Sequence, residues 1–158
     1  MLTSGERWGK VNNSPNFIGV YHYSLDAKNR LAIPVKFRSS LEVQKESVLT
    51  QGLEKCLTLY SSSAWQKVKE KLDQYTLKNR VDMRAFKRML FSSASEVSFD
   101  EEGRILVPQH LVGYAQLKKE VVLIGLGEKI EIWSKHLWEQ YEKKQKVTFE
   151  RHASELEL

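Results

Sequence analysis

Two stretches of the sequence share one pattern: Tyr23–Pro34 reads YSLDAKNRLAIP, and Val97–Pro108 reads VSFDEEGRILVP. They align without a gap from the first residue to the final proline. Each has a serine, an aspartate two residues later, and an arginine four residues after the aspartate. Apolar residues also occupy corresponding positions on both sides of the arginine. Self-similarity of this kind is the first sign of an internal repeat.

A second pair of matching blocks follows in the same order. Gly52–Ser61 reads GLEKCLTLYS and Gly125–Ser134 reads GLGEKIEIWS, and a tryptophan follows each block at Trp65 and Trp138. The spacing between the copies is one residue shorter in this pair than in the first, which is what a deletion in a loop would leave. We therefore interpret the chain as a tandem duplication of one small unit.

Each copy is predicted to be rich in strands. Residues 20–25 and 96–99 favour a strand that ends at the aspartate. Asn29 and Gly103 stand three residues after the aspartate, and both residue types tolerate a positive φ, so a tight left-handed turn is expected there. The next strand alternates in polarity and stops at the proline, which can open a short helix. Further strands are expected at 47–50, 56–60, 120–124 and 129–133.

Helices are expected after each copy, because Ser61 and Ser134 are favoured N-cap residues. Two amphipathic stretches, roughly 65–75 and 81–90, lie between the copies without a Gly/Pro-rich linker, which indicates one pseudo-two-fold α+β domain. Residues 1–15 and those from about 147 to 158 are expected to be poorly ordered. The predicted division is an N-terminal extension (1–16), a first repeat (17–63), a helical connector packed on the core (64–93), a second repeat (94–141) and a C-terminal tail (142–158).

Composition restricts the class of protein. The chain has 158 residues, which suits one domain, and a single cysteine, Cys56, which cannot form an internal disulfide. The strongest apolar run, Val121–Ile124, is far shorter than the roughly 20 residues of a membrane span, and residues 1–16 contain no stretch of signal-peptide type. We therefore expect a cytoplasmic protein. The net charge of +5 is concentrated in residues 61–90, which fits either nucleic-acid binding or a solvated helix face.

The spacing of aspartate and arginine has a physical logic. The aspartate can accept N–H groups of the turn and orient the arginine through a forked pair. Arg30 and Arg104 would then occupy equivalent places on a pseudo-symmetric body, which suits a duplex with its own two-fold symmetry. An arginine there could contact phosphates or a guanine edge. From spacing alone, the simpler interpretation is that both pairs only fix their turns, and this alternative stays open.

At these motifs the sequence resembles the MraZ family of bacterial transcriptional regulators, which belongs with the AbrB- and MazE-like swapped-hairpin proteins. The resemblance rests on LDAKNRLAIPVKFR, FDEEGRILVP, LTQGLEKCLTLY and LIGLGEKIEIWS, and it runs from about Phe17 to Tyr141. It implies a double-split β-barrel made of two AbrB-like units, and a ring-shaped homo-oligomer for which an octamer is the candidate size. It also implies nucleoid association and binding to double-stranded promoter DNA, at short tandem boxes upstream of the division and cell-wall gene cluster.

The resemblance assigns roles to residues of both motifs. The expected DNA-binding residues are Arg30, Arg104, Lys28 and Asn29, and the residues expected to support the motifs are Asp26, Asp100 and Gly103. Glu102 stands where the first copy has Lys28, so the two hairpins are not electrically equal. Lys36 and Arg38 are interpreted either as phosphate contacts or as ordinary surface charges.

Two other classes of protein compete with this interpretation. An enzyme is disfavoured because the four histidines are scattered and the sequence contains no HExxH, CxxC or Gly-rich phosphate loop. We therefore expect no catalytic residue, metal or cofactor, and Cys56 is interpreted as a small core residue. The alternative that stays open is an antitoxin-type interaction protein that binds a protein partner, for which the acidic residues near the end of the chain (150–158) are the candidate surface.

Overall fold

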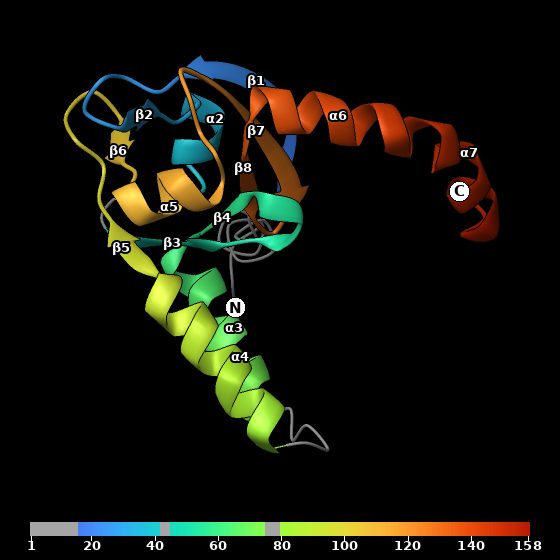
Figure 1. Cartoon of the computed structure of the whole chain (residues 1–158), viewed down its shortest axis with the longest axis horizontal. Helices are drawn as coiled ribbons and strands as arrows, with labels where there is room; N and C mark the ends of the chain where they lie inside the picture. The colour runs from blue at the N-terminus through green and yellow to red at the C-terminus, as the bar shows by residue number, and fades with distance from the viewer. Residues whose placement is uncertain (1–15, 42–44, 75–79) are drawn as a thin grey trace, which may run out of the picture.

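The computed structural model describes residues 16–41, 45–74 and 80–158. The expectation for the N-terminal extension therefore lies almost entirely outside the described residues. The chain folds into two antiparallel sheets with helices at their ends (Figure 1), which confirms the α+β class. The described strands do not close into one barrel. In the described ranges, no helix combines the length and the apolar character that crossing a membrane requires.

The larger sheet has six strands in the order β1-β7-β8-β4-β3-β5, and every neighbouring pair is antiparallel. The strands are β1 (Phe17–Ser24), β7 (Glu120–Gly127), β8 (Ile130–Ser134), β4 (Leu57–Tyr60), β3 (Ser47–Gln51) and β5 (Ser95–Val97). The first strand of each copy thus pairs with the third strand of the other copy. All these strands overlap the ranges that the sequence predicts and differ from them only at their ends.

The smaller sheet joins the two motifs directly. It consists of β2 (Arg30–Ala32) and β6 (Arg104–Leu106), with Leu31 opposite Ile105. In the larger sheet Thr58 lies opposite Glu131 in the same way. Each of these pairs joins a residue to its own counterpart in the aligned repeat, so both pairs lie on one pseudo-two-fold axis. The copies are therefore interlocked around this axis and do not stand side by side as separate units.

The main core fills the space between the two sheets. Its fully buried members come from both copies: Leu31, Leu41, Leu49, Leu57, Leu59, Ile105, Leu111, Leu123, Ile130 and Ile132. A second, smaller cluster lies on the outer face of the larger sheet, where Cys56 joins Val122, Ile124 and Trp133 beneath a helix. Cys56 is fully buried, and this burial raises the pKa of its thiol, as expected of a core residue and not of a nucleophile.

Helices begin where the sequence predicts. The short helices α2 (Val35–Arg38) and α5 (Gln109–Tyr114) follow Pro34 and Pro108. Ser61 accepts a hydrogen bond from the N–H of Ala64 at the start of α3 (Ser62–Gln74). Ser134 likewise accepts one from Leu137 at the start of α6 (Lys135–Gln145). The other helices among the described residues are α4 (Arg80–Ser93), α7 (Phe149–Glu155) and the 3-10 turns η1 (Leu53–Lys55) and η2 (Lys146–Thr148).

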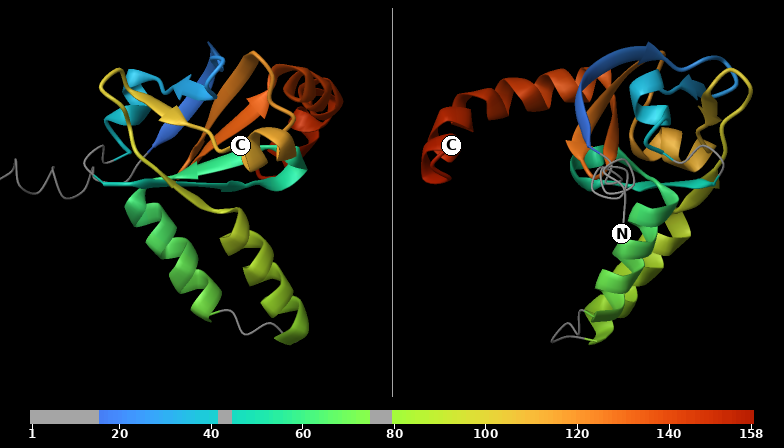
Figure 2. Two further views of the ribbon diagram at one scale, coloured as in Figure 1. Left: turned by 60° about the vertical axis from the view of Figure 1, so that its left-hand side comes forward. Right: turned by 180° about the vertical axis from the view of Figure 1, so that it is seen from behind.

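Two helical arms leave the body in different directions. The α3–α4 hairpin extends away from the sheets, and the arm of α6, η2 and α7 extends from another side (Figures 1 and 2). The connector 64–93, predicted to pack on the core, does so only at its base, through Trp65 and Ser93. Residues 147–158, predicted to be poorly ordered, instead contain a helix at Phe149–Glu155, which their Glu, Arg and Ala content favours.

The residue pair on the axis is expected to control stability. Ile105→Ala removes a fully buried side chain where the copies meet, and should lower the free energy of unfolding by about 2–5 kcal/mol. Urea denaturation followed by circular dichroism measures this. The neighbouring Leu106, which is 59% exposed, supplies the matched control: Leu106→Ala should change stability by no more than about 0.5 kcal/mol. Equal losses in the two variants would contradict the placement of the axis.

Candidate nucleic-acid interface

The first motif forms a compact turn around the Asp26 carboxylate. Oδ1 accepts hydrogen bonds from the backbone N–H groups of Lys28 (2.9 Å) and Arg30 (2.8 Å). Oδ2 accepts one from Arg30 Nε at 2.7 Å. Asn29 donates its N–H to the Asp26 carbonyl at 3.0 Å and has a φ of 60°. The predicted left-handed turn is thus confirmed. The Asp26 carboxylate accepts hydrogen bonds from both the turn backbone and the arginine side chain, and so holds the two in a fixed relative position.

The second motif repeats this geometry. Asp100 Oδ1 accepts from the backbone N–H groups of Glu102 and Arg104, both at 2.9 Å, and Oδ2 accepts from Arg104 Nε at 2.8 Å. Gly103 has a φ of 78°, so its left-handed conformation is confirmed as well. Because the two turns agree atom for atom, the guanidinium of each motif has a fixed orientation relative to its own strand.

The two turns are also tied to each other. The Asn29 carbonyl accepts a hydrogen bond from the N–H of Val107 at 2.8 Å, and the Gly103 carbonyl accepts one from Ile33 at 3.2 Å. Asn29 Nδ2 donates to Gln109 Oε1 at 2.9 Å. Each turn therefore depends on the strand of the other copy. The structure brings all seven sequence-predicted residues into these two adjoining turns, where they form one surface that we call the turn face.

Hydrogen bonding controls the charge states of the turn face. The pKa of Asp26 is lowered chiefly by the backbone N–H of Arg30, and that of Asp100 chiefly by the backbone N–H of Arg104. The hydrogen bond that Arg104 donates to the Asp100 carboxylate raises the pKa of Arg104. The side chains of Arg30 and Arg104 are 36% and 24% exposed. Because arginine stays protonated in proteins, the turn face presents two cations that are oriented by carboxylates and accessible to a ligand.

The second turn is more acidic than the first. Arg104 Nη1 lies 3.4 Å from Glu102 Oε2 and 3.8 Å from Asp26 Oδ2, in addition to the bond that Arg104 makes with Asp100. Arg104 thus faces three carboxylates. The sequence difference between Lys28 and Glu102 becomes a real electrostatic asymmetry between the two arginines, and Arg104 carries the weaker positive potential.

Arg38 partly offsets this asymmetry and is a residue that sequence reasoning did not place. Its Nε donates to the Ile33 carbonyl at 3.1 Å, and its guanidinium lies so close to Gly103 that a Cβ there would overlap it. A cation from the first copy thus reaches the turn of the second. No sequence signal reveals this contact, because it depends on which strands of the two copies pair.

Within the ranges described, the structure contains no cluster of three or more His, Cys, Asp or Glu side chains placed to hold a metal ion. The fold and the turn face therefore define a protein of two interlocked hairpin units that presents a pair of aligned arginines.

Comparison with known proteins identifies the family. The model of the family described as "MraZ protein, putative antitoxin-like" matches the chain twice, over residues 17–89 and 90–158. The chain belongs to the MraZ family. The two successive matches agree with the tandem duplication that the repeated motifs indicate.

Relatives from several bacteria share most of the chain. A protein of Clostridium acetobutylicum is 48% identical over 125 residues, which cover 79% of this chain and 86% of that protein. A protein of Clostridium tetani is 46% identical with the same coverage. One from Caldanaerobacter subterraneus subsp. tengcongensis is 42% identical over 140 residues, which cover 89% of this chain and 96% of the relative. Each is named transcriptional regulator MraZ.

The turn aspartates should make stability depend on pH in the acid range. A pKa lowered by folding stabilises the native state above the unfolded carboxyl pKa of about 3.9, and this contribution disappears as the pH falls through the lower folded pKa. Asp26→Asn should therefore be less stable than the wild type at pH 7, with a difference that vanishes below the folded pKa. Urea denaturation at several pH values measures it. A difference that stays constant from neutral to strongly acid pH would contradict the turn geometry.

Proposed function

We propose that this chain is a sequence-specific, DNA-binding transcription regulator whose turn face contacts double-stranded promoter DNA. The observation that carries the proposal is the pair of arginines, Arg30 and Arg104, held by equivalent carboxylates in two adjoining turns. The names of the relatives support the same function. The sites proposed for it are the short tandem boxes upstream of the division and cell-wall gene cluster that the family resemblance implies, with the protein acting at the nucleoid.

The proposed mechanism relies on orientation before binding. Because the carboxylate of each motif is bonded to Nε, the guanidinium plane is set before DNA arrives, and less side-chain entropy is lost on binding. A guanidinium can bridge phosphate oxygens or bond the O6 and N7 atoms of guanine. Lys28 in the first turn and Arg38 beside the second would add phosphate contacts, whereas Asn29 keeps the first turn closed through its left-handed backbone.

Oligomerisation is part of the proposal. Two arginines per chain make few base contacts, so a single chain should bind weakly. A ring-shaped homo-oligomer that presents several turn faces to regularly spaced boxes would gain affinity, since each later contact forms at a high effective concentration. We further propose that the two sheets enclosing one core correspond to the double-split barrel implied by the resemblance.

A protein partner is the second candidate. The family description contains the words "putative antitoxin-like", and exposed apolar side chains near the end of the chain, among them Phe149 and Leu156, offer a surface for another protein. A DNA titration separates the two functions, because an antitoxin-type interaction alone predicts no dependence on the turn arginines.

The direct test is a titration against the DNA upstream of the protein's own gene, repeated at several salt concentrations. Replacing both arginines with alanine should cost about 1–3 kcal/mol for each arginine that reads a base, and should reduce the salt slope. The matched control removes the same charge from α6, by Lys143→Ala and Lys144→Ala, and should keep sequence-selective binding. Equal losses of affinity in the two double variants would contradict the site.

Replacing Glu102 tests the site through an expected gain in DNA affinity. Its carboxylate competes with phosphate for Arg104 and repels the backbone of DNA, so Glu102→Gln should strengthen binding by up to about 1 kcal/mol, the range of an exposed ion pair. Glu128→Gln, an exposed change in the turn between β7 and β8, should leave the affinity unchanged. If Glu102→Gln weakened binding or had no effect at low salt, the second turn would not contact DNA.

A further inference from the structure

We propose that Leu106 reads DNA directly, by contacting the C5 methyl group of a thymine next to the base pair that Arg30 contacts. The inference rests on the proposed function and deepens it, because it names a chemical group of the DNA that the ribbon of β2 and β6 recognises. Three observations support it: the register of the ribbon, the exposure of Leu106 and the charge of its neighbours.

Leu106 lies on the same face of the ribbon as both turn arginines. The register places Arg30 opposite Leu106 and Ala32 opposite Arg104. Residues directly opposite each other in an antiparallel pair project to the same side, and successive residues of one strand project to opposite sides. The central residue of each strand is buried in the core. The other four side chains therefore form the outer face of the ribbon.

The exposure of Leu106 is not explained by the core. Its side chain belongs to a residue that is 59% exposed, and its neighbours on the outer face are the cations of Arg30 and Arg104. An aliphatic side chain between cations suits a ligand that presents anionic and apolar groups close together. The major groove of DNA is such a ligand, because phosphates line its edges and each thymine places a methyl group inside it.

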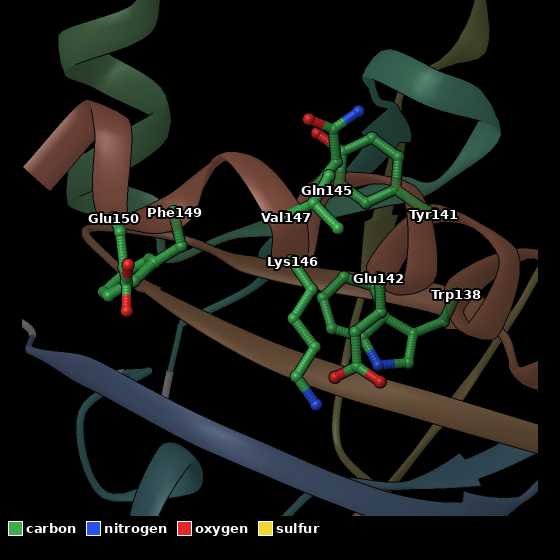
Figure 3. A pocket seen from close by; sticks show the side chains of 8 residues that line it. All are labelled: Trp138, Tyr141, Glu142, Gln145, Lys146, Val147, Phe149 and Glu150. Carbon is green, nitrogen blue, oxygen red and sulfur yellow. The ribbon is translucent and has the colours of Figure 1, made fainter.

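A larger apolar surface on the C-terminal arm has the wrong charge for DNA. An open hollow of about 790 Å³ lies between α6 and α7 (Figure 3), and its apolar lining consists of Trp138, Tyr141, Val147 and Phe149. Two carboxylates, Glu142 and Glu150, line the same hollow with one cation, Lys146. The ribbon lies on the side of the body opposite this arm (Figures 1 and 2), and there the apolar group is combined with positive charge.

The shape of the ribbon allows both contacts at once. The major groove of B-DNA is about 12 Å wide and admits a two-stranded ribbon. Because Arg30 Nε is bonded to Asp26, the guanidinium cannot extend fully from the ribbon, and the shorter side chain of Leu106 can reach the neighbouring base pair. Arginine on a guanine edge and an apolar side chain on a thymine methyl group are both common base contacts.

The two halves of the ribbon differ in this apolar contact. Ala32 occupies the position of Leu106 in the alignment of the repeats, and it lies opposite Arg104. The alanine methyl group projects less far from its strand than the branched side chain of leucine. One turn face should therefore contact one thymine methyl group, on the side of Arg30.

Removing single methyl groups from the DNA tests this contact. Each thymine position of the upstream boxes is replaced in turn by deoxyuridine, which lacks the C5 methyl group and keeps its base-pairing edge. We expect one position to weaken binding of the wild type about fourfold for each engaged box, the effect of losing one buried methyl group. Leu106→Ala should lose this sensitivity, whereas Leu106→Met, which keeps an apolar side chain, should retain it.

Leu53→Ala supplies the matched control, because Leu53 is 78% exposed and lies in η1, outside the ribbon; it should respond to deoxyuridine as the wild type does. A wild type with no sensitive thymine, or equal sensitivity in Leu106→Ala, would overturn the inference. Either result leaves the proposed function standing if Arg30→Ala with Arg104→Ala still abolishes selective binding. Binding that is absent, or independent of both arginines, would overturn the proposed function and this inference together.

Discussion

The pairing of β2 with β6 is the interaction on which the rest of the structure depends. Each strand has only three residues, and a ribbon of that size has no stability of its own. It persists because Leu31 and Ile105 are buried at its centre between the sheets, and because the first strand of each copy pairs with the third strand of the other copy in the larger sheet. Neither copy can therefore bury its core alone, and the duplication behaves as one domain.

The geometry of the turn face follows from that pairing. The two left-handed turn residues, Asn29 and Gly103, each accept a hydrogen bond from the other copy, so the distance between the two arginines is set by the backbone. Within this fixed frame the copies have diverged, most clearly at Lys28 and Glu102. The helices after each copy have diverged further, into a basic hairpin and a bent arm that ends in acidic residues.

Sequence reasoning predicted the local structure well. The strand positions, the positive φ of Asn29 and Gly103 and the serine N-caps all follow from short-range chemistry, and the structure confirms them. The exchange of strands could not be derived from the repeat, because two copies with identical patterns can pair within themselves or with each other. The place of Arg38 beside Gly103 depends on that exchange of strands, so it could not be predicted from the sequence either.

The exposure of side chains on the two helical arms is a second feature that the sequence alone does not predict. Spacing of apolar residues predicts a helix at 81–90 but does not say whether side chains such as Phe86 and Met89 face the core or solvent, and both are exposed. The helix at Phe149–Glu155 was missed because it is short and its apolar residues are not part of the main core. The spacing of apolar residues along one chain does not decide whether such residues are covered.

Cleavage of DNA by a tethered iron chelate tests the central claim most directly. The only cysteine, Cys56, is fully buried, so a chelate can be attached selectively to Lys28→Cys, Glu102→Cys or, as a control in the turn between β7 and β8, Glu128→Cys. The account predicts cleavage of the upstream DNA within its boxes from positions 28 and 102, and none from position 128. Cleavage from position 128 alone, or none from either turn while the DNA is bound, would contradict it.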